Sequence, residues 1–153
     1  MLEKEQSAPN FELLDANQNA ISLHDFLGKK VVLYFYPKDD TPGCTKEAIG
    51  FSELLSEFSD NNTVVIGVSK DSPESHLKFI QKYDLKVYLL SDPTGGVLES
   101  YGVWQEKSNY GKKYMGVLRS TFLIDEKGVI ENVWKNVKVE GHTQAVLGVC
   151  SRA

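Results

Sequence analysis

Two short, continuously apolar runs most constrain how this chain can fold. Residues 31–36 and 63–68 are rich in β-branched and aromatic side chains and lack the polar alternation of a half-exposed strand. Such runs are typical of strands that are covered on both faces. Between them, apolar residues recur at spacings of three and four over 44–58, which predicts a helix. The chain is therefore expected to form a sheet with helices packed against it.

The remaining segments extend this alternation. Residues 11–14 and 20–23 flank a turn-rich stretch and predict an N-terminal β-hairpin. Further strands are expected at 87–90, 120–124 and 129–134, and further helices at 73–83, shortly after Asp92-Pro93 and at 142–149. The tract 104–114 predicts a solvated loop. The pattern predicts an α/β fold with a central mixed sheet flanked by helices.

Length and charge exclude several classes of protein. The 153 residues suit one domain, and no linker or repeat divides them, so residues 1–153 are expected to form a single domain. A net charge of −4 argues against a nucleic-acid-binding protein. No apolar run reaches the length of a membrane span, so neither nucleic acid nor a membrane is expected as a partner. The first six residues lack the apolar core of a secretory signal, which favours a cytoplasmic location.

The residues around Cys44 carry the most chemistry. Cys44 lies where a buried strand is expected to lead into a helix, the edge at which α/β proteins usually build sites. The first helical turn favours a thiolate, Thr41 offers a hydroxyl, and Pro37 could form an apolar wall. Against this, Asp39 and Asp40 would raise the pKa of a nearby thiol, and most free cysteines are small buried residues. These residues alone leave both interpretations open.

A family resemblance favours the reactive interpretation. The spacing Pro37-x-x-x-Thr41-x-x-Cys44 resembles the active-site signature of the peroxiredoxins. The string YPKDDTPGCTKEA that contains it is similar to the bacterioferritin-comigratory, or PrxQ-type, branch. Two further segments resemble that branch: 8–11 (APNF) and 116–125 (GVLRSTFLID).

The resemblance implies both a fold and an activity. It implies a thioredoxin-like fold and a thiol-dependent peroxidase that reduces hydrogen peroxide and organic hydroperoxides through a sulfenic acid on Cys44. It also implies that Thr41, Pro37 and Arg119 complete the catalytic pocket. The chemistry suits these residues, because negative charge moves from sulfur to the leaving oxygen and a permanent cation such as Arg119 stabilises it.

The chain departs from this branch at the resolving position. Many members carry a resolving cysteine five residues after the peroxidatic one, where this chain has Ile49. The remaining thiol, Cys150, is interpreted either as a small residue on the closing helix or as a remote or inter-subunit resolving residue. The third possibility is a one-cysteine cycle in which an outside thiol reduces the sulfenic acid directly. We expect the one-cysteine cycle.

Neither a cofactor nor a metal is expected. His24, His76 and His142 are isolated and lack metal-ligand spacing. No nicotinamide or flavin fingerprint is present, so electrons should arrive from a thiol reductant such as thioredoxin or glutaredoxin/glutathione. The tract 104–114 could border the peroxide pocket or a docking surface for the reductant. The expected oligomeric state is a monomer or a weak homodimer.

Two other functions compete with the peroxidase. One is a non-enzymatic peroxide-sensing or interaction module that uses oxidised Cys44, which would be oxidised once rather than turn over. The other is a thiol–disulfide oxidoreductase, which is disfavoured because no second cysteine lies near Cys44 in the sequence.

Overall fold

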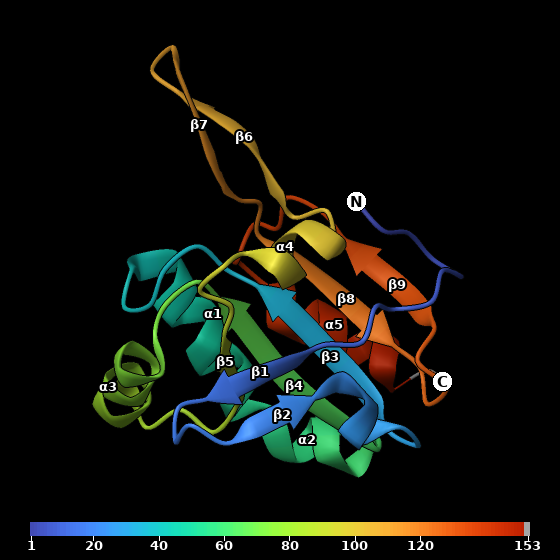
Figure 1. The fold of residues 1–153 in the computed structure, drawn as a ribbon. Coiled ribbons are helices and arrows are strands. Elements are labelled where there is room, and N and C mark those ends of the chain that lie inside the picture. The colour runs from blue at the N-terminus through green and yellow to red at the C-terminus, as the bar shows by residue number, and fades with distance from the viewer. Residues whose placement is uncertain (152–153) are drawn as a thin grey trace.

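The two apolar runs form the middle of a seven-stranded mixed sheet (Figure 1). The computed structural model describes residues 1–151. In the order β2-β1-β5-β4-β3-β8-β9, the strands of the sheet are β2 (Ala20–Ser22), β1 (Glu12–Asp15), β5 (Tyr88–Ser91), β4 (Thr63–Ser69), β3 (Lys30–Phe35), β8 (Ser120–Ile124) and β9 (Ile130–Trp134). β3, β4 and β5 are parallel, whereas β1, β2, β8 and β9 pair antiparallel with their neighbours. The predicted N-terminal hairpin and late hairpin are confirmed.

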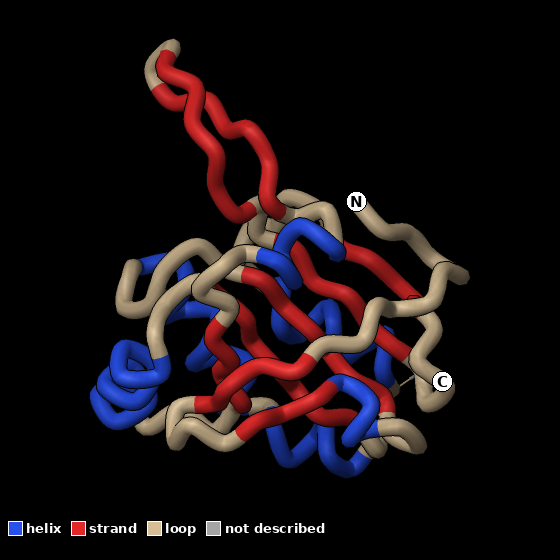
Figure 2. Tube along the Cα trace, in the orientation of Figure 1, coloured by secondary structure: helices blue, strands red, loops and turns tan. Residues whose placement is uncertain are grey.

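Helices cover both faces of this sheet (Figures 1 and 2). They are the 3₁₀ helix η1 (Leu23–Phe26) and the α-helices α1 (Pro42–Glu53), α2 (Leu55–Asp60), α3 (Pro73–Tyr83), α4 (Gly96–Ser100) and α5 (His142–Cys150). A separate two-stranded ribbon consists of β6 (Trp104–Asn109) and β7 (Lys112–Val117). No helix among residues 1–151 is long and apolar enough to cross a membrane.

The uninterrupted burial of β3 follows from its central place in the sheet. Successive side chains of a strand point to opposite faces. Val31, Leu33 and Phe35 therefore pack in one core with residues of η1 and α4, and Val32 and Tyr34 pack in a second core under α1, α2, α3 and α5. This two-sided burial explains why the strand has no polar alternation.

Two sequence predictions were wrong in detail. The helix expected over 44–58 begins at Pro42 and is broken at Leu54, whose φ of −97° and ψ of 4° end α1 and redirect the chain so that α2 contacts β4. The expected loop at 104–114 is instead part of the β6–β7 ribbon. Most side chains of this ribbon are exposed or only partly buried, so the apolar alternation that indicates a strand is missing from its sequence.

Candidate active site

Cys44 lies in the first turn of α1, directly beyond the carboxyl end of β3. Thr41 has extended backbone angles and precedes Pro42, the first helical residue, so that Cys44 is the third residue of the helix. The first N–H groups of a helix have no partner within the helix, and the positive end of the helix dipole favours an anion there. The Cys44 side chain is nevertheless buried, with 1% of its surface exposed. The site therefore combines helix-derived positive potential with exclusion of water.

Arg119 supplies a positive charge directly at the sulfur. It lies between β7 and β8, and its Nη2 donates to Cys44 Sγ at 3.2 Å while its Nη1 donates to Glu47 Oε1 at 2.7 Å. A Cβ at Gly43 would come within 3.1 Å of Arg119 Nη2, so glycine leaves room for the guanidinium. Burial opposes the charge of Arg119, but Glu47 and Cys44 outweigh it and raise the pKa of the guanidinium. The structure thus brings Cys44 and Arg119 together across 75 positions of sequence.

Glu47 is a site residue that the sequence analysis missed. It lies three residues after Cys44, on the same side of α1, and its side chain is fully buried. Burial raises the pKa of Glu47 to about 7, although the neighbouring Arg119 lowers it. Within residues 1–151, Glu47 Oε2 has no hydrogen-bond partner. The i, i+3 spacing from Cys44 was the signal that could have identified this residue.

His142 faces the same buried carboxylate from the start of α5. Its Nε2 lies 4.0 Å from Glu47 Oε2 and 2.8 Å from the hydroxyl of Thr121. Burial, together with the positive charge of Arg119, lowers the pKa of His142 to about 4. The imidazole is therefore neutral at pH 7, and its contact with Thr121 is a neutral hydrogen bond. The histidine that looks isolated in sequence lies beside the site in the fold.

Thr41 and Pro37 lie on the loop that precedes α1, and neither forms a hydrogen bond with Cys44 Sγ. The Thr41 hydroxyl donates to the backbone oxygen of Lys38 at 2.8 Å, which closes the loop that precedes α1. Its oxygen lone pairs remain available as acceptors. Pro37 is exposed where the chain leaves β3.

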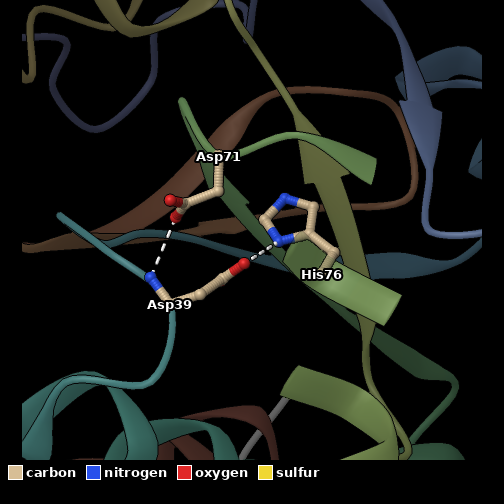
Figure 3. Close-up of side chains that lie close together, drawn as sticks. All are labelled: Asp39, Asp71 and His76. Atoms are coloured by element: carbon tan, nitrogen blue, oxygen red, sulfur yellow. Dashed lines mark hydrogen bonds and ion pairs between the residues drawn. The ribbon is translucent and has the colours of Figure 1, made fainter. Parts of the chain in front are cut away.

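The two aspartates that argued against a reactive thiol are both engaged by α3. Asp40 accepts hydrogen bonds from Lys82 Nζ at 2.8 Å and from Tyr83 Oη at 2.6 Å, and these bonds lower its pKa. Asp39 is buried and pairs with His76, whose Nδ1 lies 2.7 Å from Asp39 Oδ2 (Figure 3). Both aspartates thus have hydrogen-bond partners other than Arg119.

Asp39 also ties the loop before α1 to the rest of the domain. Its backbone N–H donates to Asp71 Oδ2 at 2.9 Å, as Figure 3 shows, and its Oδ1 accepts from Tyr36 Oη at 2.6 Å. His76 Nε2 lies 3.0 Å from the carbonyl oxygen of Leu90, which can only accept, so Nε2 carries a proton. Asp39, Asp71 and His76 could together reach a metal ion, but hydrogen bonds within the protein already engage Asp39, Asp71 Oδ2 and both ring nitrogens of His76. We therefore interpret the cluster as an anchor for the loop.

A shallow pocket borders the first turn of α1. Its lining includes Thr41, Pro42, Thr45 and Ile49 from the loop and α1, and Tyr83 from α3. Ile49, at the usual resolving position of the PrxQ branch, is partly buried in this lining. The pocket gives the first turn of α1 an approach from solvent.

Cys150 lies far from this site. His142 is at the start of α5 next to Glu47, and Cys150 is eight residues later, about 12 Å along the helix at a rise of ~1.5 Å per residue. A disulfide requires Cα atoms closer than about 7 Å. Cys150 is buried, with 2% of its surface exposed, and burial raises its pKa to about 11. Its polar surroundings include Lys30 at the opposite end of β3.

The sequence of this chain is similar to those of known proteins over most of its length. Residues 5–133 match the model of the AhpC/TSA family. A protein of Coxiella burnetii is 54% identical over 147 residues, which cover 96% of this chain and 97% of that protein. Peroxiredoxin Bcp of Bacillus subtilis is 46% identical, with 93% of this chain and 90% of that protein covered.

Solved structures extend the similarity to the whole fold. A cysteine-to-serine mutant of Xylella fastidiosa PrxQ superimposes with a TM-score of 0.94 at 35% identity, covering 99% of this chain and 97% of that one. Bacterioferritin comigratory protein of Xanthomonas campestris, studied for its alkyl peroxide reduction activity, gives a TM-score of 0.89 at 38% identity, covering 93% of this chain and 90% of that one.

Proposed function

The chain belongs to the AhpC/TSA family and is a thiol-dependent peroxidase of the peroxiredoxin type, and we propose that Cys44 is its peroxidatic residue. The observation that carries this assignment is the 3.2 Å contact between Arg119 Nη2 and Cys44 Sγ in the first turn of α1. A thiolate needs such a positive environment to exist in a buried place. Cys150 has no comparable hydrogen bond from a cation among the described residues.

The proposed step transfers one oxygen atom to the sulfur. The Cys44 thiolate attacks the nearer oxygen of the hydroperoxide, the S–O bond forms, and the O–O bond breaks. The electron pair of that bond leaves with the second oxygen, which takes up a proton and departs as water or an alcohol. Arg119 and the first N–H groups of α1 stabilise the negative charge where it develops. Cys44 is left as a sulfenic acid.

Other residues of the site have supporting roles in this proposal. Glu47 orients the guanidinium of Arg119 through the 2.7 Å ion pair, so that Nη2 points at the sulfur. The Thr41 hydroxyl keeps free lone pairs toward an incoming peroxide, and Pro37 forms one wall of the pocket once substrate covers it. Neither residue contacts the sulfur through a hydrogen bond before substrate binds, so both roles depend on the substrate-bound state.

We propose a one-cysteine cycle for the return to the thiol. Ile49 removes the local resolving position, and Cys150 is buried about 12 Å along α5 from the residue next to the site. An outside thiol therefore condenses with the Cys44 sulfenic acid, releases water and forms a mixed disulfide, which a second thiol then reduces. Thioredoxin and glutaredoxin/glutathione are the proposed sources of these thiols. The proposed setting is the cytoplasm, and the proposed assembly is a monomer or a weak homodimer.

Steady-state peroxide consumption with dithiothreitol tests the assignment. Wild-type protein is expected to turn over many times, as is Cys150→Ser. Cys44→Ser is expected to lose turnover while its circular dichroism spectrum and melting temperature stay close to wild type. Substantial residual turnover by Cys44→Ser would remove Cys44 as the nucleophile. A single stoichiometric oxidation of the wild type would instead support the peroxide-sensing module.

A further inference from the structure

The β6–β7 ribbon projects away from the rest of the molecule (Figures 1 and 2). Its two strands pair with each other from Trp104–Val117 to Asn109–Lys112 and with no strand of the main sheet. Each strand has six residues, so the tip stands roughly 20 Å from the base at ~3.3 Å per residue. A projection of this length adds little to the core of the domain.

The base of the ribbon adjoins the candidate active site. β7 ends at Val117, two residues before Arg119, and Leu118 between them donates its N–H to the Val103 oxygen at 2.8 Å. Figure 1 shows the ribbon rising from the end of the sheet toward which β3 runs, which is also the end where α1 begins. A protein that approaches Cys44 therefore meets this ribbon on one side.

The tip of the ribbon carries a residue that its turn does not favour. Tyr110 and Gly111 both have positive φ, 51° and 79°. Two-residue hairpin turns of this kind prefer Asn, Asp or Gly at the first position, because other side chains are strained there. The Tyr110 side chain is 98% exposed, so no contact within the domain compensates this strain. A fully exposed aromatic ring in a strained position points to a role outside the folding of the chain.

The ribbon also concentrates apolar surface and positive charge. Residues 1–151 include six exposed large hydrophobic side chains, and three of them lie on the ribbon: Tyr110, Tyr114 and Met115. Aromatic residues and Met are enriched at protein interfaces. Residues 104–117 contain three lysines and one glutamate, a charge of +2 on a chain whose net charge is −4. The ribbon thus offers apolar anchors within a basic surface.

From these observations we infer that the β6–β7 ribbon is the docking element for a folded protein dithiol reductant with an acidic face. The inference rests on the proposed reduction of the Cys44 sulfenic acid by an outside thiol. The reductant's first thiol forms the mixed disulfide with Cys44 and releases water. Its second thiol then displaces Cys44, so that the reductant leaves as a disulfide.

The size of the ribbon favours a protein over a small thiol. A folded protein of about 100 residues has a radius of gyration of roughly 13 Å. When such a protein presents a thiol at Cys44, its flank reaches a ribbon that extends roughly 20 Å from the same edge. Dithiothreitol or glutathione can react at Cys44 without touching Tyr110.

Tyr110→Asn tests the inference because it improves the turn and removes the aromatic ring. With thioredoxin as the reductant, kcat/KM is expected to fall roughly tenfold, the loss typical of an interface anchor. With dithiothreitol the variant should match wild type. The matched control is Tyr88→Asn, which alters a tyrosine of 42% exposure at the opposite end of the parallel strands and should change neither activity beyond about twofold.

The charge of the ribbon is tested in the same assay. Lys112→Glu/Lys113→Glu should lower kcat/KM for thioredoxin and weaken the dependence of this kcat/KM on ionic strength, again without effect on turnover with dithiothreitol.

Equal thioredoxin kinetics in wild type and Tyr110→Asn would overturn the inference, and so would a wild type that accepts dithiothreitol but not thioredoxin. If Tyr110→Asn instead converts a dimer to a monomer in analytical ultracentrifugation, the ribbon is a contact between copies. Failure of the wild type with dithiothreitol would contradict the proposed function itself.

Discussion

The two cysteines of this chain are equally buried but have opposite surroundings. Cys44 is 1% exposed and lies in the first turn of α1, whereas Cys150 is 2% exposed and is the last residue of α5. Arg119 donates to the sulfur of Cys44, and burial raises the pKa of Cys150 to about 11. The positive end of a helix dipole stabilises a thiolate and the negative end opposes one. From this difference we infer that the charge around a buried thiol, and not its burial, decides whether the thiol is reactive.

The largest expected difference is in chemical reactivity. At pH 7 the thiolate fraction of a thiol with a pKa of about 11 is roughly one in 10⁴, so Cys150 should be nearly inert. Iodoacetamide is therefore expected to alkylate Cys44 in the native protein at least a hundredfold faster than Cys150, measured by peptide mass spectrometry. Equal rates in 6 M guanidinium chloride would serve as the control. Equal rates in the native protein would contradict the comparison.

Removing the guanidinium of Arg119 should make Cys44 less reactive toward peroxide, and so more similar to Cys150. Arg119→Met is expected to slow sulfenic acid formation by about a hundredfold, because loss of one transition-state donor typically costs that much. Arg119→Lys keeps the charge but loses the two-pronged contact with Cys44 and Glu47, so it should be impaired less. Rapid-mixing oxidation kinetics give both rates. If both variants oxidise at the wild-type rate, Arg119 has only a structural role.

Glu47 is expected to make the stability of the protein depend on pH, because its raised pKa lies near neutrality. Its pKa in the folded protein is about 7, raised by burial from the usual 4.5, so the folded state binds this proton more tightly than the unfolded state. The resulting stability is fully present below pH 4.5 and is lost as the pH rises through 7. Between these pH values, wild type should lose about 1 to 3 kcal/mol of unfolding free energy relative to Glu47→Gln.

Denaturant titrations of both proteins across this range measure the Glu47 effect. His142, whose pKa is lowered to about 4, contributes the opposite slope in both proteins, so the Glu47 effect is measured as the difference between them. Parallel stability profiles for wild type and Glu47→Gln would mean that Glu47 is ionised throughout.

The smallest expected effect is that of Cys150→Ser on inactivation by peroxide. A sulfenic acid without a fast resolving partner persists, and excess peroxide oxidises it further to the sulfinic acid. Because Cys150 is buried away from the site, its removal should leave the rate of inactivation within about twofold of wild type. A markedly more sensitive variant would show that Cys150 protects Cys44.

The part of the candidate site that depends on local sequence pattern could be predicted from the sequence. The apolar run before Cys44 and the motif around it were sufficient to place the thiol at the start of a helix at the sheet edge. The break at Leu54 was missed because the apolar periodicity continues across it. Contacts between distant segments could not be predicted from the sequence. Examples are the contacts of His142 with Glu47 and of His76 with Asp39. These depend on how α5 and α3 pack, which no local pattern records.

Mass spectrometry of the protein treated with one equivalent of hydrogen peroxide shows directly which of the two cysteines is oxidised. With dimedone present to trap sulfenic acid, we expect an adduct on Cys44 alone and a reduced, unmodified Cys150. We expect no disulfide between them when dimedone is left out. A Cys44–Cys150 disulfide, within one chain or between two, or a dimedone adduct on Cys150, would contradict the division of roles between the two cysteines.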